Sequence, residues 1–366
     1  MTSIQKLKSP IKIGKHIIKY PIIQGGMGVG ISWDKLAGTV SLNGGLGVIS
    51  TVGTGYYDYP NYLGAKHLSV PNAAECNSKV ALNEIFSKAR AICGNSPIAA
   101  NVMHVLSNYK ENVVDACEAG ADIIICGAGL PVDLPKLTEN FPDVALVPIV
   151  SSARALRLIV KKWQKYGRLP DAIVVEGPLS GGHQGFKYED CFLPENQLEV
   201  IVSEVIEESS KYGSIPVFAA GGIWNQNDIL RFLDLGCAGV QMGTRFVATF
   251  ECDTSDAHKD ALLKCKESDI TLKRSPVGLP SRSITTNLHK LIEAGKAPRI
   301  SCKSNCVSPC KHGVGAREVG YCIADRLGDC LLGNTETGLF FTGSNGYRVN
   351  EIISVVELFN KLLEGE

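Results

Sequence analysis

Residues 121–177 contain three short apolar runs that decide the fold: ADIIICG at 121–127, VALVPIV at 144–150 and AIVVEG at 172–177. Each run is apolar without alternation, which is typical of parallel strands buried on both faces. Similar runs lie on both sides of this stretch, at Pro21–Gln24, Gly45–Ser50, Pro97–Met103, Pro216–Gly222 and Gly239–Thr244. The sequence therefore predicts eight buried strands.

Stretches of helical character separate these strands. Ser32 is a candidate N-cap for a helix with Leu36, Ala37 and Val40, and further helices are expected at Asn108–Ala119, Ser152–Tyr166, Glu195–Ser210 and Asn225–Leu235. Gly120, Gly167 and Gly236 stand where helix C-caps are expected. Eight strands alternating with helices over about 250 residues favour a TIM (β/α)8 barrel. A doubly wound open sheet is the rival that periodicity alone leaves open.

The pattern divides the chain into three parts. We expect a barrel at residues 1–250, a smaller lid or insert region with a Cys-rich segment at 251–346, and a C-terminal helix at 347–366, where Ile352–Leu363 has an amphipathic pattern. Residues 51–75 form a long connection, either an active-site loop or a small packed insertion. The segment KRSPVGLPSRS at 273–283 is expected to be irregular.

Composition excludes several classes of protein. The 366 residues carry 37 Lys plus Arg and 37 Asp plus Glu, so the formal net charge is zero. This balance argues against a nucleic-acid binder or a polybasic membrane protein, because both need a cationic surplus. The chain shows neither an apolar signal core nor a run long enough to span a bilayer, so a cytoplasmic location is expected.

Glycines follow several of the predicted strands, at the end of a barrel where active sites are built. Gly25, Gly26 and Gly28 after the first strand would let the backbone approach a flat ligand, although a simple tight turn is the alternative. Gly221 and Gly222 after the seventh strand, with Gly243 and Thr244 after the eighth, fit a phosphate site. Arg245 would add charge there or form a structural ion pair.

His183 lies between glycines in EGPLSGGHQG at 176–185, after the sixth strand. An imidazole in this setting has little packing from its neighbours, and its unperturbed pKa near 6.5 suits proton transfer. A solvated loop histidine is the alternative. His104 is a weaker second candidate. Asn101, near the end of the third strand, can pair with a polar ring edge or cap the strand, and Ser151 and Ser152 can touch a ligand or cap the next helix.

Five motifs carry a family resemblance. QGGMG (24–28), AANVM (99–103), GPLSGGHQG (177–185), AAGGI (219–223) and QMGTRFVATFEC (241–252) occur in this order. Together they resemble the nitronate monooxygenase (2-nitropropane dioxygenase) family, which also includes flavin-dependent enoyl-ACP reductases. The resemblance runs through about residues 15–290 and implies a TIM barrel that binds FMN, with a smaller lid.

The resemblance also implies roles for individual residues. His183 would be the catalytic histidine. The residues implied to line the flavin ring, bond it or cradle its phosphate are Gly25, Gly26, Met27, Asn101, Gly221, Gly222, Gly243 and Thr244, and we add Glu176, Gly181 and Gly182 from the histidine loop. No metal is expected at this site. FMN would supply the redox chemistry and the protein the orientation and polar tuning.

Two sequence features disagree on whether this chain is similar to the enoyl reductases within the family. The segment with Ser275–Pro280 and Arg282 is similar to one prominent in the enoyl reductases. Those reductases typically carry an acid directly before Ser-Gly-Gly-His, where this chain has Leu179, although Glu176 is retained further back.

Three functions are therefore kept. The first is oxidation of a nitronate with O2 to a carbonyl compound and nitrite, with His183 orienting the anion or removing the α-proton of a nitroalkane. The second is NAD(P)H-dependent reduction of an enoyl thioester, and the third is a non-catalytic flavin and thiol redox sensor. The partners expected are small molecules with O2 or NAD(P)H, neither nucleic acid nor membrane, and a homodimer is compatible with all three.

Thirteen cysteines make up the unusual part of the composition. The number is odd, so complete intramolecular pairing is impossible, and a cytosolic protein keeps its thiols reduced. Five crowd near the C-terminus: Cys302, Cys306, Cys310, Cys322 and Cys330. Buried structural thiols are the main interpretation, with a metal or iron–sulfur site and redox disulfides as alternatives. The later segment GLFFTGSNGYR at 338–348 is expected to belong to the lid and to cover the flavin, with Arg348 near an anionic substrate.

Overall fold

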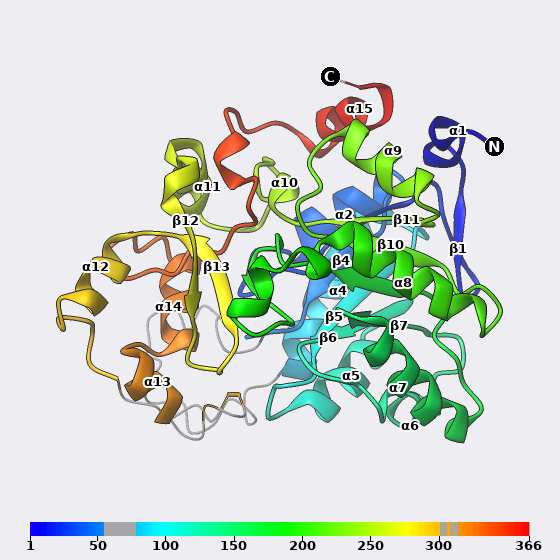
Figure 1. Cartoon of the computed structure of the whole chain (residues 1–366), viewed down its shortest axis with the longest axis horizontal. Coiled ribbons are helices and arrows are strands. Elements are labelled where there is room, and N and C mark those ends of the chain that lie inside the picture. The colour runs from blue at the N-terminus through cyan, green and yellow to red at the C-terminus, as the bar shows by residue number, and fades with distance from the viewer. Residues whose placement is uncertain (55–77, 301–305, 308–309, 311–313, 366) are drawn as a thin grey trace.

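Eight parallel strands form a closed barrel at the centre of the molecule (Figure 1). The structure, a computed structural model, describes residues 1–54, 78–300, 306–307, 310 and 314–365. The strands are β3 (Ile22–Gln24), β4 (Gly47–Ser50), β5 (Ile98–Met103), β6 (Ile123–Gly127), β7 (Ala145–Val150), β8 (Ile173–Glu176), β10 (Val217–Ala220) and β11 (Gly239–Met242). Their order is β3-β11-β10-β8-β7-β6-β5-β4, and a parallel bridge between Ile23 and Leu46 joins the two ends. The TIM barrel prediction is confirmed, and the open sheet is excluded.

The continuous apolarity of the strands has a direct cause in this arrangement. In β6, Ile123 and Ile125 belong to the core inside the barrel, whereas Ile124 and Cys126 belong to the core between the strands and the helices. Side chains alternate between the two faces of a strand, and here both faces are covered, so both need apolar residues.

Helices cover the outside of the barrel, as predicted. They are α2 (Asp34–Leu42), α4 (Ser78–Cys93), α5 (Tyr109–Glu118), α6 (Leu134–Leu137), α7 (Ala153–Trp163), α8 (Leu198–Ser210), α9 (Gln226–Asp234) and the short α10 (Thr244–Val247). The three predicted C-terminal glycines, Gly120, Gly167 and Gly236, all have positive φ, the conformation that such caps require. Helices α4, α6 and α10 were not predicted. The long connection expected at 51–75 lies outside the described residues from position 55 on.

The prediction that Ser32 caps the first barrel helix is wrong. Trp33 occupies the N-cap position of α2, and the Ser32 hydroxyl accepts the N–H of Met27 at 2.9 Å. The free N–H groups of this helix end instead donate to the carboxylate of Asp253, from Trp33 at 2.8 Å and from Leu36 at 3.2 Å. The carboxylate accepts hydrogen bonds from these N–H groups, and its negative charge lies at the positive end of the helix dipole. It belongs to a residue more than two hundred positions away in the sequence.

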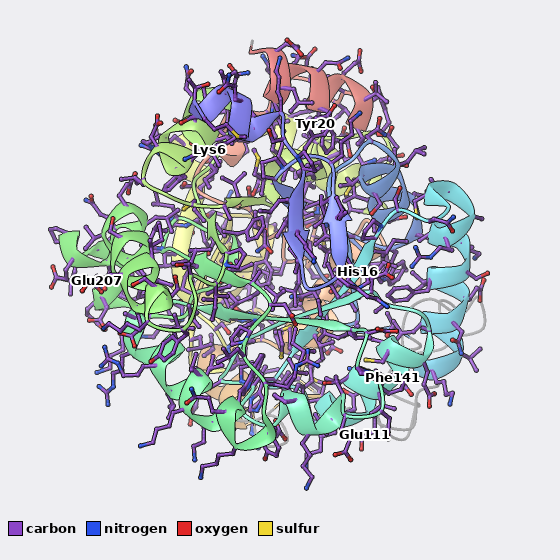
Figure 2. All side chains as sticks on the ribbon, turned by 90° about the vertical axis from the view of Figure 1, so that its right-hand side faces the viewer. Lys6, His16, Tyr20, Glu111, Phe141 and Glu207 are labelled. Atoms are coloured by element: carbon purple, nitrogen blue, oxygen red, sulfur yellow. The ribbon has the colours of Figure 1, made fainter. Side chains whose placement is uncertain are left out.

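A hairpin closes the N-terminal end of the barrel. Strands β1 (Ile11–Ile13) and β2 (His16–Ile18) pair antiparallel, and Ile13 and Ile18 pack into the core inside the barrel. Figure 2 looks onto this end, with the hairpin and His16 in front of the barrel. The short helix α1 (Ser3–Leu7) packs against α9. Because this end is plugged, access to the barrel is from the opposite end.

Elements from residues 256–331 lie over the side opposite the N-terminal hairpin (Figure 1). They are α11 (Asp256–Lys264), β12 (Ile270–Arg274), β13 (Pro280–Ile284), α12 (Asn287–Glu293), α13 (Val314–Val319) and α14 (Ile323–Leu331). The segment 273–283, expected to be irregular, contains parts of both strands of the antiparallel hairpin β12–β13. That prediction is wrong because the turn residues Pro276 and Gly278 obscured two strands of only five residues each.

The amphipathic C-terminal helix is confirmed as α15 (Val355–Glu364). It packs against α9 and α2, so it completes the ring of helices at the seam where β11 meets β3. Single turns of 3-10 helix occur at Gln164–Tyr166, Glu189–Phe192, Pro194–Asn196, Glu267–Asp269 and Gly346–Arg348. No helix in the described part of the chain is long and apolar enough to cross a bilayer. The division of the chain at residues 250 and 346 stays a prediction.

Candidate active site

One cavity of about 1060 Å³ lies at the carboxyl ends of the barrel strands. The twelve residues predicted as catalytic or cofactor-binding all line it: Gly25, Gly26, Met27, Asn101, Glu176, Gly181, Gly182, His183, Gly221, Gly222, Gly243 and Thr244. Ser151 and Ser152 line it as well, and Ser152 also caps α7 by accepting the N–H of Ala155. The loops that follow different strands therefore converge on one site, as the barrel geometry requires.

Gly26 shows how closely the backbone passes the Asn101 side chain. A Cβ built on Gly26 would lie 2.2 Å from the Cβ of Asn101, too close for any other residue. Asn101 donates a weak hydrogen bond of 3.4 Å from Nδ2 to the carbonyl of Ile125, and its side chain borders the cavity. The absence of a side chain on Gly26 thus lets the loop after β3 pack directly against Asn101 at the end of β5, and both residues line the cavity.

Two buried polar atoms in this cavity were missed by the sequence analysis. Gln241 Oε1, on β11, and Ser50 Oγ, at the end of β4, have no hydrogen-bond partner in the part of the chain that the structure describes. Both residues line the cavity. A buried polar atom without a partner is costly, so these positions fit a site whose ligand carries hydrogen-bonding groups. The apolar run around Gln241 concealed it in the sequence.

The glycine loops after β10 and β11 meet a segment from the far end of the chain, Phe341–Asn345. Asn345 Nδ2 donates to the carbonyl of Gly222 at 2.8 Å, and the N–H of Gly343 donates to Thr244 Oγ1 at 2.8 Å. Gly221 and Gly222 have φ of +102° and +78°, which favours glycine at both. All five residues of the segment line the cavity, and the expectation that this tail covers a flavin stays a prediction.

The lid hairpin fixes His183 on two sides. Backbone pairing joins β13 to β9 (Gly182–His183), with Ser281 opposite His183. His183 Nε2 lies 2.8 Å from Ser275 Oγ, and that hydroxyl also accepts the N–H of Val277 at 3.3 Å. Phe341 packs edge-on against the imidazole, with 5.4 Å between ring centroids. The side chain is therefore held in one orientation by Ser275, 92 positions downstream, and by Phe341, still further along the chain.

Burial changes the charge of two groups in the cavity. Burial lowers the pKa of His183 to about 4, so its imidazole is uncharged at neutral pH. Burial raises the pKa of Glu176 to about 7, and a hydrogen bond from Ser180 opposes that rise. Perturbed groups in a cleft are typical of functional sites. A neutral imidazole can accept a proton or donate its N–H, and a carboxyl group of this kind can exchange a proton near neutral pH.

Other candidates from the sequence lie elsewhere. His104 packs against Tyr109, with 4.7 Å between ring centroids, and Arg245 lies over the ring of Trp224. Arg348 also lies over Trp224, 5.3 Å from its centroid, and is exposed. None of the three borders the cavity among the lining residues that are described. Arg348 does not line the cavity itself but lies over Trp224, which does, so the expectation that Arg348 reaches an anionic substrate stays a prediction.

The clustered cysteines divide between environments. Cys330 is buried in the core shared with the barrel, Cys310 is buried among lid residues, and Cys306 borders the cavity. Cys302 lies outside the described residues. In the described ranges, no three His, Cys, Asp or Glu side chains are grouped as metal ligands.

Cys252 lies outside this cluster and shows the effect of burial on a thiol. Burial raises the pKa of the Cys252 thiol to about 12, so this sulfur stays protonated and behaves as an apolar side chain.

Comparison with known proteins identifies the family. A family profile described as nitronate monooxygenase matches residues 9–365. The chain belongs to the nitronate monooxygenase family. The resemblance predicted from five motifs is thereby confirmed, and the protein is an oxidoreductase of a flavoprotein family.

Individual relatives are distant in sequence. Proteins named "Probable nitronate monooxygenase" from Staphylococcus aureus strains JH9 and MSSA476 are each 28% identical to this chain, with 73% of the chain and 76% of each relative covered. Among solved structures, FabK from Thermotoga maritima is similar with a TM-score of 0.71 and 24% identity, covering 95% of this chain and 93% of that one. A nitroalkane oxidase from Streptomyces ansochromogenes has a TM-score of 0.66 and 20% identity, covering 95% and 96%. At these identities the structures support the fold.

Proposed function

We propose that this protein is an FMN-dependent nitronate monooxygenase, which oxidises alkyl nitronates with O2 to carbonyl compounds and nitrite. The proposal rests on the family assignment and on one observation above all. An uncharged, rigidly held histidine shares a single cavity with a glycine-lined wall that has room for a planar cofactor. The redox chemistry would be supplied by FMN when it is bound.

The residues present fit FMN. Gly25, Gly26 and Met27 would border the flavin ring together with Asn101, and the unpartnered Gln241 Oε1 would meet a hydrogen-bond donor of the ring. Backbone N–H groups of the loops at Gly221–Gly222 and Gly243–Thr244 would hold the phosphate. Neither Lys nor Arg is present among the described lining residues of these loops, so this end would bind by amides and hydroxyls.

His183 would bind and orient the nitronate. Its imidazole is uncharged at neutral pH, so it would donate the N–H of one ring nitrogen to an anionic oxygen while the other ring nitrogen accepts the hydroxyl hydrogen of Ser275. With a neutral nitroalkane as substrate, the same ring would accept the α-proton. Ser275 and Phe341 hold the ring and keep it from turning toward solvent, which preserves the distance to the substrate.

The test is O2 consumption by the FMN-loaded protein with alkyl nitronates, with nitrite measured as product. Flavin-free protein should regain activity with FMN and much less with riboflavin, which lacks the phosphate. O2 uptake that does not depend on nitronate, or equal recovery with riboflavin, would contradict the proposal.

A second function, NAD(P)H-dependent enoyl thioester reduction, is favoured by one observation. The SPVGLPSR segment, which is similar to that of the enoyl reductases, directly supports His183 through Ser275, and Arg282 donates to the carbonyl of Pro178 at 2.8 Å. Oxidation of NADPH that depends on a crotonyl thioester, without nitronate turnover, would favour this function. The cytoplasmic location stays a prediction and can be tested by fractionation.

A further inference from the structure

A second cavity, called the lid cavity below, lies away from the active site. Its volume is about 220 Å³, and it is lined by Lys273, Arg274, Ser281, Ser283, His289, Ile292, Glu293, Val319 and Tyr321. None of these nine residues is among the described residues that border the active-site cavity. The lid cavity has room for about seven water molecules, since each has a share of about 30 Å³ in the liquid. It can therefore hold a ligand of only a few non-hydrogen atoms.

One face of the hairpin β12–β13 gives the lid cavity its polar lining. Ser281 and Ser283 are two residues apart on β13, so their side chains lie on the same face, and Lys273 of β12 is directly opposite Ser281. The two serines are only 2% and 1% exposed. The buried face of an antiparallel sheet is usually apolar, because buried hydroxyl groups need hydrogen-bond partners. The polar character of this face is therefore more typical of a binding surface than of a core.

His289 of α12 adds a hydrogen-bond donor of fixed direction. Its Nδ1 accepts the N–H of Thr286 at 3.1 Å, so the neutral ring carries its proton on Nε2. Burial lowers the pKa of His289 to about 4, so the ring is neutral at pH 7. The contact of Nε2 with Ser283 Oγ is long, at 3.5 Å. The Nε2–H group can therefore form a shorter hydrogen bond with a ligand.

The charged groups at the edge of the lid cavity favour an anion. Lys273 is 34% exposed and forms an ion pair of 3.0 Å with the more exposed Glu293. Arg274 also lines the cavity, so two cations and one anion leave a formal charge of +1 beside the uncharged His289. An anionic ligand would receive a charge-assisted hydrogen bond from the ammonium group of Lys273.

The remaining lining is carbon. Ile292 and Val319 are partly buried and pack against the apolar core of the lid. Tyr321 is hydrogen-bonded to Ser281 and contributes the surface of its ring. A ligand that fills the cavity thus meets donors and a cation as well as aliphatic and aromatic surface. A bare inorganic anion would use only the polar part of this lining.

We propose that the lid cavity binds a short-chain carboxylate, with its carboxylate group at Lys273, Ser283 and His289 and its hydrocarbon part against Ile292 and Val319. Such a ligand matches the size, the charge and both kinds of lining. It would stabilise the lid, because it binds only when the hairpin and α12 are in place. The proposal does not depend on which substrate the active site oxidises.

The test titrates the FMN-loaded protein with sodium formate, acetate, propionate and butyrate, with ionic strength held constant by sodium chloride. Binding is measured by calorimetry, and the flavin absorbance is recorded in parallel. Affinity should rise about fourfold per methylene from acetate to butyrate. Inorganic phosphate is the second probe and should bind more weakly than butyrate. The flavin absorbance should stay unchanged, because the lid cavity does not border the active site.

Three variants test the residues of the lid cavity. Lys273→Gln should weaken butyrate binding about tenfold, since it removes the charged donor. Lys290→Gln is the matched control, because Lys290 is exposed on α12 and does not line the cavity. Val319→Phe should abolish binding by filling the cavity while every polar group stays in place. Circular dichroism and flavin content show whether each variant is folded, and the two lysine variants decide the test even if Val319→Phe is not.

The outcomes are distinct. Butyrate should raise the unfolding midpoint of the wild type and of Lys290→Gln, but not that of Val319→Phe. Absence of saturable carboxylate binding, or an equal loss in the two lysine variants, would overturn the proposal. Binding that shifts the flavin absorbance and persists in Lys273→Gln would place the anion in the active-site cavity and would also overturn it. Tighter binding of phosphate than of butyrate would refute the carboxylate assignment.

Discussion

Acidification should destabilise the protein through a buried histidine behind the cavity wall. His258 on α11 has no exposed surface, and its Nδ1 lies 3.0 Å from Thr254 Oγ1. Its Nε2 lies 3.2 Å from the carbonyl oxygen of Phe341, the residue that packs on His183. Burial lowers the pKa of His258 to about 4, compared with 6.5 for an unperturbed histidine.

The sign and size follow from proton linkage. Between these two pKa values the unfolded chain binds a proton that the folded protein does not, so the stability supplied by neutral His258 is present above 6.5 and is lost as the pH falls. At pH 5 nearly all unfolded chains carry the proton and about a tenth of the folded ones do. The loss from pH 7 to pH 5 is then about 2 kcal/mol for this one residue.

The measurement is the free energy of unfolding by urea at both pH values, for the wild type and for His258→Gln. The variant should lose about 2 kcal/mol less than the wild type over this range. His183 and His289, whose pKa values burial also lowers to about 4, contribute equally to both proteins. A packing defect in the variant lowers its stability by the same amount at both pH values, so it does not change the loss between them. Equal losses in the two proteins would refute the assignment of a buried neutral His258.

Three further predictions concern the cavity. His183→Asn should lower turnover by roughly 10²–10⁴-fold while bound flavin per protein is unchanged, and normal turnover would remove His183 from the mechanism. Gly26→Ala should overpack against Asn101 at a cost of about 1–3 kcal/mol and reduce flavin content, so full flavin retention would show that the backbone approach is not needed. Glu176→Gln should remove a step near pH 7 from the pH profile of the flavin spectrum, since the wild-type carboxyl loses its proton as the pH rises through about 7; a persisting step would assign that proton to another group.

Much of the barrel could be predicted because each of its strands carries its own local signal. Buried parallel strands need apolar residues on both faces, which produced the continuous runs around Ile123–Gly127 and Ala145–Val150. The glycine loops and His183 were found for the same reason, because the chain order of a barrel places every strand end on one face. These predictions depend only on residues that are close together in the sequence.

The parts that were missed depend on distant contacts. Asp253 caps α2, Ser275 holds His183, and Asn345 bonds to Gly222, and nothing near any of these residues indicates its partner. The pairing of β13 with the histidine strand β9 also joins segments about a hundred residues apart. The contact of Arg348 with the ring of Trp224 also joins residues that are far apart in the sequence.

The pairing of β13 with β9 has a consequence for synthesis on the ribosome. All eight barrel strands have been translated by Met242, but Ser275 and the segment Phe341–Asn345 emerge later. A nascent chain can therefore assemble barrel strands while its histidine is still unsupported. A protease that cuts within the lid would have the same effect on the finished molecule. Activity would then cease before the barrel unfolds. During limited proteolysis, activity should therefore disappear while the circular dichroism signal and the main unfolding transition of the barrel are still present.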